Sequence, residues 1–153
     1  MKFIKLVVVM NLLCATHGAI AQETLRKGYQ YEIEISDCIQ DAGDELAQRQ
    51  QCYIAPTAWA ESQQKAAYDL LMTSSMTDTK KKELQDVQRK WEQFREADCR
   101  FSGELPLSGP WPFVAREDCY LKHLVHRTNE LTWLAILHLP PKEMQGKLPL
   151  RSK

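Results

Sequence analysis

The chain has 153 residues, with 20 basic and 20 acidic side chains and 44% hydrophobic residues. This length suits one domain, and the balanced charge argues against a nucleic-acid-binding protein, which would carry a clear basic excess. The composition also differs from that of a disordered chain, which combines low hydrophobicity with high net charge.

The start of the chain has the features of a secretory signal peptide. Lys2 and Lys5 give it a positive charge, Leu6 to Ala15 form an apolar run, and Ala19-Ile20-Ala21 matches an A-x-A cleavage site. We therefore predict that residues 1–21 are removed and that the mature chain resides in the periplasm; a short buried helix is the alternative. Without this segment the acidic residues outnumber the basic ones by two, and no remaining apolar run could span a membrane.

Residues 22–37 are expected to form an extended lead-in to the domain. Within them Tyr29, Tyr31, Ile33 and Ile35 alternate with polar side chains, a spacing typical of a strand. The rest of the chain has helical periodicity and offers this segment no strand to pair with, so we expect it to pack on the helices. Addition to a β-sheet of a partner protein is the alternative.

The first long helix is predicted over residues 44–72, with Asp44 as its N-cap. Pro56 interrupts this segment, and because proline removes one backbone donor it should kink the helix or make it restart. One face of the segment is apolar and is expected to pack in the core. Its members are Trp59, Ala60, Ala67, Leu70 and Leu71.

The second helix is predicted over residues 78–98, capped by Thr77 or Asp78. Its apolar side chains have the spacing of a heptad seam, which should face the neighbouring helices. The residues of this seam are Leu84, Val87, Trp91 and Phe94.

A loop is predicted over residues 100–112, since three prolines and two glycines within it disfavour regular structure. The third helix follows over residues 113–138, with an apolar stripe that should also pack in the core. Pro140 and Pro141 end this helix, and residues 140–153 are expected to form a flexible tail. The stripe consists of Val114, Leu121, Leu124, Val125, Leu131, Leu134 and Ala135.

These elements predict an all-α fold, in which residues 38–139 form a small antiparallel bundle of about three long helices. The predicted mature chain has four cysteines, and an even number in an exported protein predicts two disulfides. Antiparallel packing would bring Cys99 at the end of one helix close to Cys119 early in the next, which favours that pair. Cys38–Cys52 then follows by elimination, although exchanged pairing stays open because Cys52 lies near the same end. A zinc site is a weaker alternative, since no C-x2-C pair is present.

No arrangement typical of an enzyme is present. The chain lacks the common nucleophile, zinc-protease and phosphate-binding motifs, so we expect no enzymatic activity and no cofactor. His123, His126 and Glu130 have the spacing of metal ligands on one helix face. No second element supplies further ligands, so we expect no metal and interpret the three as ordinary helix-face residues, with His123 and His126 at the border of the core.

Two segments resemble the LprI-type lysozyme-inhibitor family. Residues 88–99 resemble its Q-R-x-W-x-x-F-R-x-A-x-C sequence, and residues 127–131 resemble its R-T-x-E-L sequence. The resemblance covers about residues 38–135 and implies a periplasmic, four-cysteine helical domain that inhibits lysozyme. Pro56, the sequence just before Cys52 and the proline-rich 105–112 segment depart from the family pattern.

The residues of this motif are expected to act mainly in structure. We expect Trp91 and Phe94 to lie in the core as part of the helix seam. Arg95 and Arg127 would lie beside the seam, where each guanidinium could pair with a carboxylate or a helix carbonyl.

The leading hypothesis is a periplasmic inhibitor or immunity protein that blocks a lysozyme-like cell-wall hydrolase. A plug for a cleft with two carboxylates needs hydrogen-bond donors and an aromatic anchor on a rigid support. The predicted loop offers Arg100, Ser102, Ser108 and Trp111, and the Cys99–Cys119 bridge would hold it in place. The alternative use of the loop is a stiff connection with Trp111 packed on the bundle.

A second hypothesis is a non-enzymatic structural or interaction module of the bacterial envelope, with the helix faces as its docking surface. Both hypotheses imply a protein partner rather than nucleic acid. A lytic enzyme that co-purifies with the chain would favour the inhibitor, and an envelope complex would favour the module.

Overall fold

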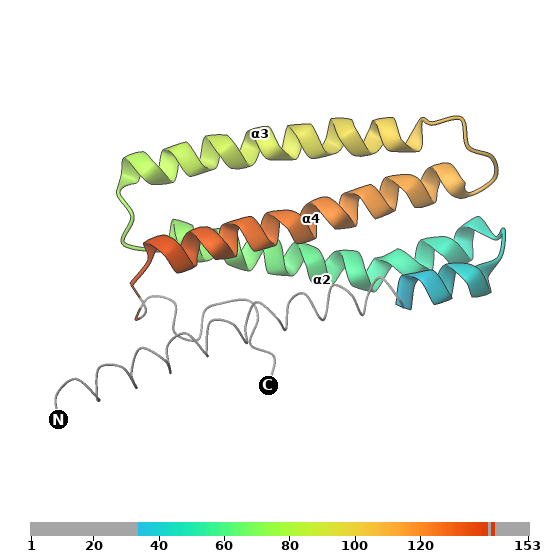
Figure 1. Ribbon diagram of the computed structural model, residues 1–153, viewed down its shortest axis with the longest axis horizontal. Helices are drawn as coiled ribbons and strands as arrows, with labels where there is room; N and C mark the ends of the chain where they lie inside the picture. Colours follow the sequence, from blue (N-terminus) through green and yellow to red (C-terminus); the bar gives the residue numbers. More distant parts are fainter. Residues whose placement is uncertain (1–33, 141, 143–153) are drawn as a thin grey trace, which may run out of the picture.

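The computed structural model describes residues 34–140 and residue 142. Within this part the chain forms a short helix over 34–42, three long helices and no strand. The long helices are α2 (Leu46–Met72), α3 (Asp78–Gly103) and α4 (Trp111–His138). Figure 1 shows them side by side, each running opposite to the one before, with the short helix beside the start of α2. The predicted all-α bundle is therefore confirmed, with four described helices in place of about three.

The short helix covers the end of the segment that was expected to be extended. Residues 34–37 are helical, which corrects the prediction for 22–37 in this part. Ile35 and Ala42 are buried and Ile39 is partly buried, and their spacing is that of one helix face. The alternation of apolar and polar residues up to Ile35 favoured a strand instead. Residues 22–33 and the predicted signal peptide lie outside the described residues, as do 141 and 143–153 of the predicted tail.

α2 is a continuous helix that includes Pro56, so the helix does not restart there. Its N-cap is Glu45 rather than the predicted Asp44, and the Glu45 side chain makes no capping hydrogen bond. Asp44 follows Gly43, whose φ of 55° is accessible to glycine and reverses the chain after the short helix. The Asp44 carboxylate instead lies 3.5 Å from the guanidinium of Arg49.

The packed face of α3 differs from the predicted heptad seam. Val87 and Phe94 are 49% and 58% exposed, whereas the polar Gln88 is buried and Trp91 is partly buried. The seam prediction is therefore wrong for Val87 and Phe94. The face of α3 that packs on α4 includes Gln88 instead, because Gln88 is hydrogen-bonded to Arg127 of α4. The helix is capped as predicted by the side-chain oxygen of Thr77.

The connection between α3 and α4 is shorter than the predicted 100–112 loop. α3 continues to Gly103 and α4 begins at Trp111, which leaves residues 104–110 as the link. Pro110 is the N-cap of α4 and Pro112 lies in its first turn, where a missing backbone N–H leaves no helical hydrogen bond unmade. Gly103 allows the two helices to approach closely, because a Cβ there would lie 3.2 Å from the Cβ of Arg116.

α4 is the central helix and packs against both α2 and α3. Its apolar stripe is buried largely as predicted, with the exceptions of Leu134, which is exposed, and Val125, which is partly buried. One core cluster lies toward the start of α4 and includes Tyr53 and Leu124, and a second lies toward its end and includes Leu71 and Leu131. None of the described helices combines the length and apolarity that crossing a membrane requires.

Two disulfides stabilise the half of the bundle that contains the start of α4. Cys38 is bonded to Cys52, which ties the short helix to α2, and Cys99 is bonded to Cys119, which ties α3 to α4. The Cα–Cα distances are 5.8 Å and 5.3 Å, both ordinary for disulfides. This is the pairing that the sequence favoured, and the exchanged pairing does not occur.

Candidate functional site

The two family-like segments meet in one polar cluster between α3 and α4. Arg127 is buried, and its Nε donates a hydrogen bond of 3.1 Å to Oε1 of Gln88, 39 residues earlier in the chain. Its Nη1 lies 2.9 Å from the carboxylate of Glu130 one turn along α4. The buried position of Gln88 on α3 thus follows from the need of Arg127 for a partner.

Trp91 lies against two guanidinium groups in this cluster. The Cζ of Arg95 is 4.8 Å and that of Arg127 is 5.7 Å from the centroid of the Trp91 ring. Arg95 also lies over the ring of Tyr120 at 4.2 Å, and burial raises the pKa of the Tyr120 hydroxyl. Cation–π contacts of this kind hold the guanidinium planes between α3 and α4. These motif residues therefore form a packing cluster, and Phe94 lies outside it.

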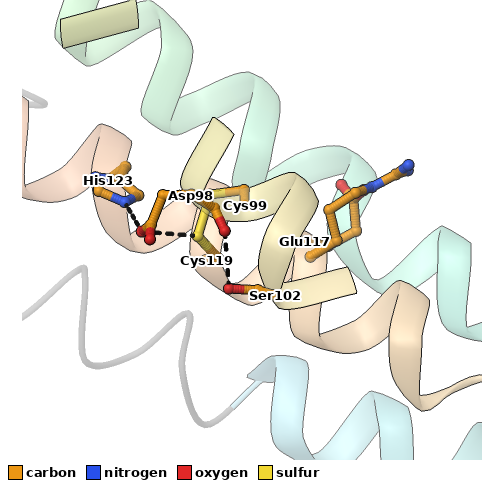
Figure 2. The surroundings of a disulfide bond; sticks show 7 residues. Asp98, Cys99, Ser102, Glu117, Cys119 and His123 are labelled. Atoms are coloured by element: carbon orange, nitrogen blue, oxygen red, sulfur yellow. Dashed lines mark hydrogen bonds and ion pairs between the residues drawn. A yellow bond between two sulfur atoms is a disulfide. The ribbon is translucent and has the colours of Figure 1, made fainter. Parts of the chain in front are cut away.

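The surroundings of the second disulfide contain a histidine–carboxylate pair, shown in Figure 2. Nε2 of His123 lies 2.8 Å from Oδ2 of Asp98, and the same oxygen is 3.7 Å from Sγ of Cys119. Ser102 donates a hydrogen bond of 3.1 Å to the backbone oxygen of Asp98. Sequence reasoning missed Asp98, although it precedes a cysteine and faces His123 once α3 and α4 are antiparallel.

This arrangement places four potential metal-ligating atoms within 4.8 Å of one another, from Asp98, Cys99, Cys119 and His123. Both cysteines are consumed in the disulfide, so neither can act as the thiolate that binds a metal ion. Glu130, from the helix face considered in the sequence, pairs with Arg127 instead. On the same face His123 pairs with Asp98, and the side chain of His126 is exposed.

The α3–α4 tip, defined as residues 100–112, holds the four residues proposed for partner binding. Arg100 and Ser102 belong to the last turn of α3, Ser108 is exposed in the link, and Trp111 is the first residue of α4. Arg100 is exposed, and Glu104 is its counterion at 3.9 Å. These residues thus occupy one end of the bundle, but Ser102 is bonded to its own helix rather than presented outward.

The tip carries more exposed apolar surface than the sequence analysis identified. Phe101, Leu105 and Leu107 are exposed, and Trp111 is 46% exposed. The sequence analysis predicted a loop here and selected Trp111 as its only apolar candidate for partner binding. The sequence did contain a signal for this surface. Four large apolar side chains occur within a short stretch rich in proline and glycine, and such a cluster in a connecting segment indicates an interaction surface.

Trp111 is held from its other side by α2. The Cζ of Arg49 lies 4.4 Å from the centroid of the Trp111 ring, while Nε of Arg49 donates to the backbone oxygen of Gly43. The sequence predicted Trp111 either as an exposed binding anchor or as a residue packed on the bundle. Its ring fits both predictions, because one part packs on the bundle and the other remains in solvent.

Beside this contact, a buried tyrosine joins α2 to α4. The hydroxyl of Tyr53 donates a hydrogen bond of 2.7 Å to Oδ1 of Asp118. Burial and the interaction with Asp118 raise the pKa of Tyr53 far above its ordinary value. The base of the tip is thus fixed by an aromatic, a hydrogen-bonded and a disulfide contact.

Comparison with known proteins supplies the family. The family model described as "Lysozyme inhibitor LprI" matches residues 38–131, which is more than half of the chain. No curated protein and no solved structure matches the chain. The matched range contains both disulfides and both segments of the polar cluster. The chain therefore belongs to the LprI family of lysozyme inhibitors.

Proposed function

We propose that this protein is an exported inhibitor, or an immunity protein, that binds and blocks a lysozyme-like cell-wall hydrolase through the α3–α4 tip. The observation that carries this proposal is the set of exposed apolar side chains at the tip, Phe101, Leu105, Leu107 and Trp111. A concentration of large apolar residues at one exposed end marks an interaction surface. Aromatic residues are also the commonest anchors of protein interfaces.

The charges near the tip suit the chemistry of such a target. A glycoside hydrolase cleft contains two carboxyl groups, so an inhibitor that fills it benefits from cationic donors. Arg100 and Arg116 are both exposed near the end of the bundle. The Arg100–Glu104 pair is long and exposed, so exchanging Glu104 for a carboxylate of the target would cost little.

The support of the tip favours tight binding. The Cys99–Cys119 bond, the close approach at Gly103 and the contact between Arg49 and Trp111 all restrict its motion. A segment that is ordered before binding loses less conformational entropy in the complex. The tip therefore combines exposed anchors with a rigid base.

A titration of lysozyme activity on peptidoglycan against the mature protein tests the proposal. We expect stoichiometric loss of activity and a marked weakening of inhibition by Trp111→Ala. Trp133→Ala is the matched control, because Trp133 is a 59% exposed tryptophan near the other end of the same helix. Equal inhibition by the parent and both variants would refute the role of the tip.

The second candidate, an envelope interaction module, has an observation of its own. Trp133, Leu134 and Leu137 are exposed near the end of α4, away from the tip. Loss of binding in Trp133→Ala, with Trp111→Ala unaffected, would favour this candidate. Isolation of the protein from the periplasm with an envelope complex rather than a lytic enzyme would support the same conclusion.

A further inference from the structure

A cavity of about 710 Å³ lies between the short helix 34–42, the first half of α2 and α4. Its walls are largely apolar and include Ile39 from the short helix, Trp59 from α2 and Val125 from α4. This volume is within the range of sites that bind small organic molecules. The cavity is separate from the exposed face of the tip, although Trp111 contributes to its lining.

The cavity wall contains a buried cation with incomplete pairing. Arg49 is only 4% exposed, and its Nη1 has no hydrogen-bond partner among the described residues. Its counterion, Asp44, lies 3.5 Å away and is 93% exposed, so solvent weakens their attraction. Burying a guanidinium without full compensation is costly, so the charge of Arg49 adds to the positive character of the cavity lining.

Two further basic side chains line the same cavity from α4. Lys122 and His126 lie one turn apart, and the side chain of neither makes a hydrogen bond or an ion pair with another described residue. The carboxylate in the lining is Asp118, and it accepts the hydroxyl hydrogen bond of Tyr53. Basic groups therefore outnumber acidic ones around a mainly apolar space.

We propose that this cavity binds a small amphiphilic anion, with its apolar part against Ile39, Trp59 and Val125 and its carboxylate toward Lys122 and His126. Apolar walls with a few convergent polar groups are the usual composition of such a site. The ammonium of Lys122 favours an anionic head group, the imidazole of His126 can donate a hydrogen bond to it, and the apolar walls favour an apolar body. The cavity shares Trp111 with the proposed inhibitory surface, but the tip residues Phe101, Leu105 and Leu107 do not line it, and Lys122 and His126 lie outside the tip.

Fluorescence of anilinonaphthalene sulfonate, an apolar sulfonate, measures occupancy of the folded, oxidised protein. We expect saturable one-to-one binding and displacement by dodecanoate. Dodecyltrimethylammonium, with the same alkyl chain and a positive head group, should displace the probe far less. Absence of saturable binding, or equal displacement by the two surfactants, would overturn the proposal.

Variants locate the binding in this cavity. The double variant Lys122→Ala with His126→Ala should weaken probe binding about tenfold, since both side chains are exposed and their removal leaves the core intact. Lys82→Ala, which removes an exposed lysine of α3 away from the cavity, is the matched control. Val125→Trp should narrow the cavity and weaken binding.

Equal affinity in the double variant and the Lys82→Ala control would refute the assignment of the head-group site. Each variant is first compared with the parent by its melting temperature, and the double variant serves as the decisive one if Val125→Trp does not fold. The double variant should still inhibit the target hydrolase, so failure of the cavity proposal and failure of the inhibitor proposal give different results.

Discussion

At the scale of single residues, the burial of Tyr53 and its hydrogen bond to Asp118 should make the folded protein less stable as the pH rises into the alkaline range. The pKa of Tyr53 is raised first by burial and then by the hydrogen bond to Asp118, from an ordinary value of 10.0. Tyr53 contributes fully to the free energy of unfolding below that value, where its hydroxyl is neutral in both the folded and the unfolded chain. As pH rises above it, the unfolded chain loses the proton while the folded chain retains it, so stability falls.

Tyr53→Phe should therefore flatten the decline of stability above pH 10.0. Near neutral pH the variant should lose about 1 kcal/mol through the missing hydrogen bond. Urea unfolding of both proteins across this pH range measures the two effects. Parallel declines of parent and variant above pH 10.0 would show that Tyr53 is not the group responsible.

The two sides of the Arg127 interaction should contribute unequally. Arg127→Ala removes a buried guanidinium, leaves Gln88 without its partner and removes a contact with Trp91. We expect a loss of about 3 kcal/mol or more in the free energy of unfolding. Glu130→Ala removes only the exposed partner and should cost less than about 1 kcal/mol. Chemical denaturation compares them, and equal losses would contradict the buried role of Arg127.

At the scale of helices, apolar periodicity predicted the residues that pack against apolar neighbours. It missed the residues that pack through hydrogen-bonded polar pairs. The stripe of α4 was predicted almost completely because α4 is central and buries Leu121, Leu124 and Leu131. α3 packs mainly on α4. Its residue Gln88 is buried because it accepts a hydrogen bond from Arg127, which lies 39 residues away in the chain. A pattern confined to one helix contains no information on such a pair.

The candidate site shows the same division. Cysteine count and antiparallel order were sufficient to favour the two disulfides. The proline-rich segment was expected to be irregular throughout, but Pro110 and Pro112 begin α4 because proline is well tolerated at a helix start. The contact of Arg49 with Trp111 could not be predicted, since it joins α2 to α4 through their three-dimensional order.

The two disulfides close loops with sequence separations of 14 and 20 residues, and each should stabilise the fold by about 3 kcal/mol in the chain-entropy model. Their local effects should differ. Replacing Cys38 and Cys52 by alanine frees the short helix, so limited proteolysis should accelerate around residues 43–45 while α3 and α4 stay protected. Replacing Cys99 and Cys119 should loosen the tip instead. Equal cleavage patterns in the two double variants would contradict this division.

At the scale of the whole molecule, export is the condition for both disulfides and for access to a cell-wall hydrolase. We expect that N-terminal sequencing of the exported protein begins at Gln22 or within a residue or two, because Ala19-Ile20-Ala21 forms the cleavage site. The exported protein should also contain no thiol that reacts with an alkylating agent before reduction. An intact Met1 in periplasmic material would exclude export by this route.

The architecture also predicts that inhibition and stability can be separated by substituting two different tryptophans. Trp91→Ala removes a partly buried ring beside Arg95 and Arg127, so the melting temperature should fall while the remaining folded protein still inhibits. Trp111→Ala removes a half-exposed ring and should change the melting temperature little, while binding of the hydrolase weakens by about 2 kcal/mol.

Arg100→Ala should weaken hydrolase binding less than Trp111→Ala does, and its effect should shrink as ionic strength rises, because an exposed guanidinium acts through a screened attraction to the carboxylates of the target. Inhibition titrations at low and high salt, with melting curves for every variant, measure all three substitutions. Lys82→Ala, an exposed charge on α3 outside the tip, is the control for general electrostatic effects. If Trp111→Ala unfolds the protein as Trp91→Ala does, or if Arg100→Ala and Lys82→Ala respond equally to salt, the hydrolase does not bind at the tip and the exposed faces of the helices become its contact surface.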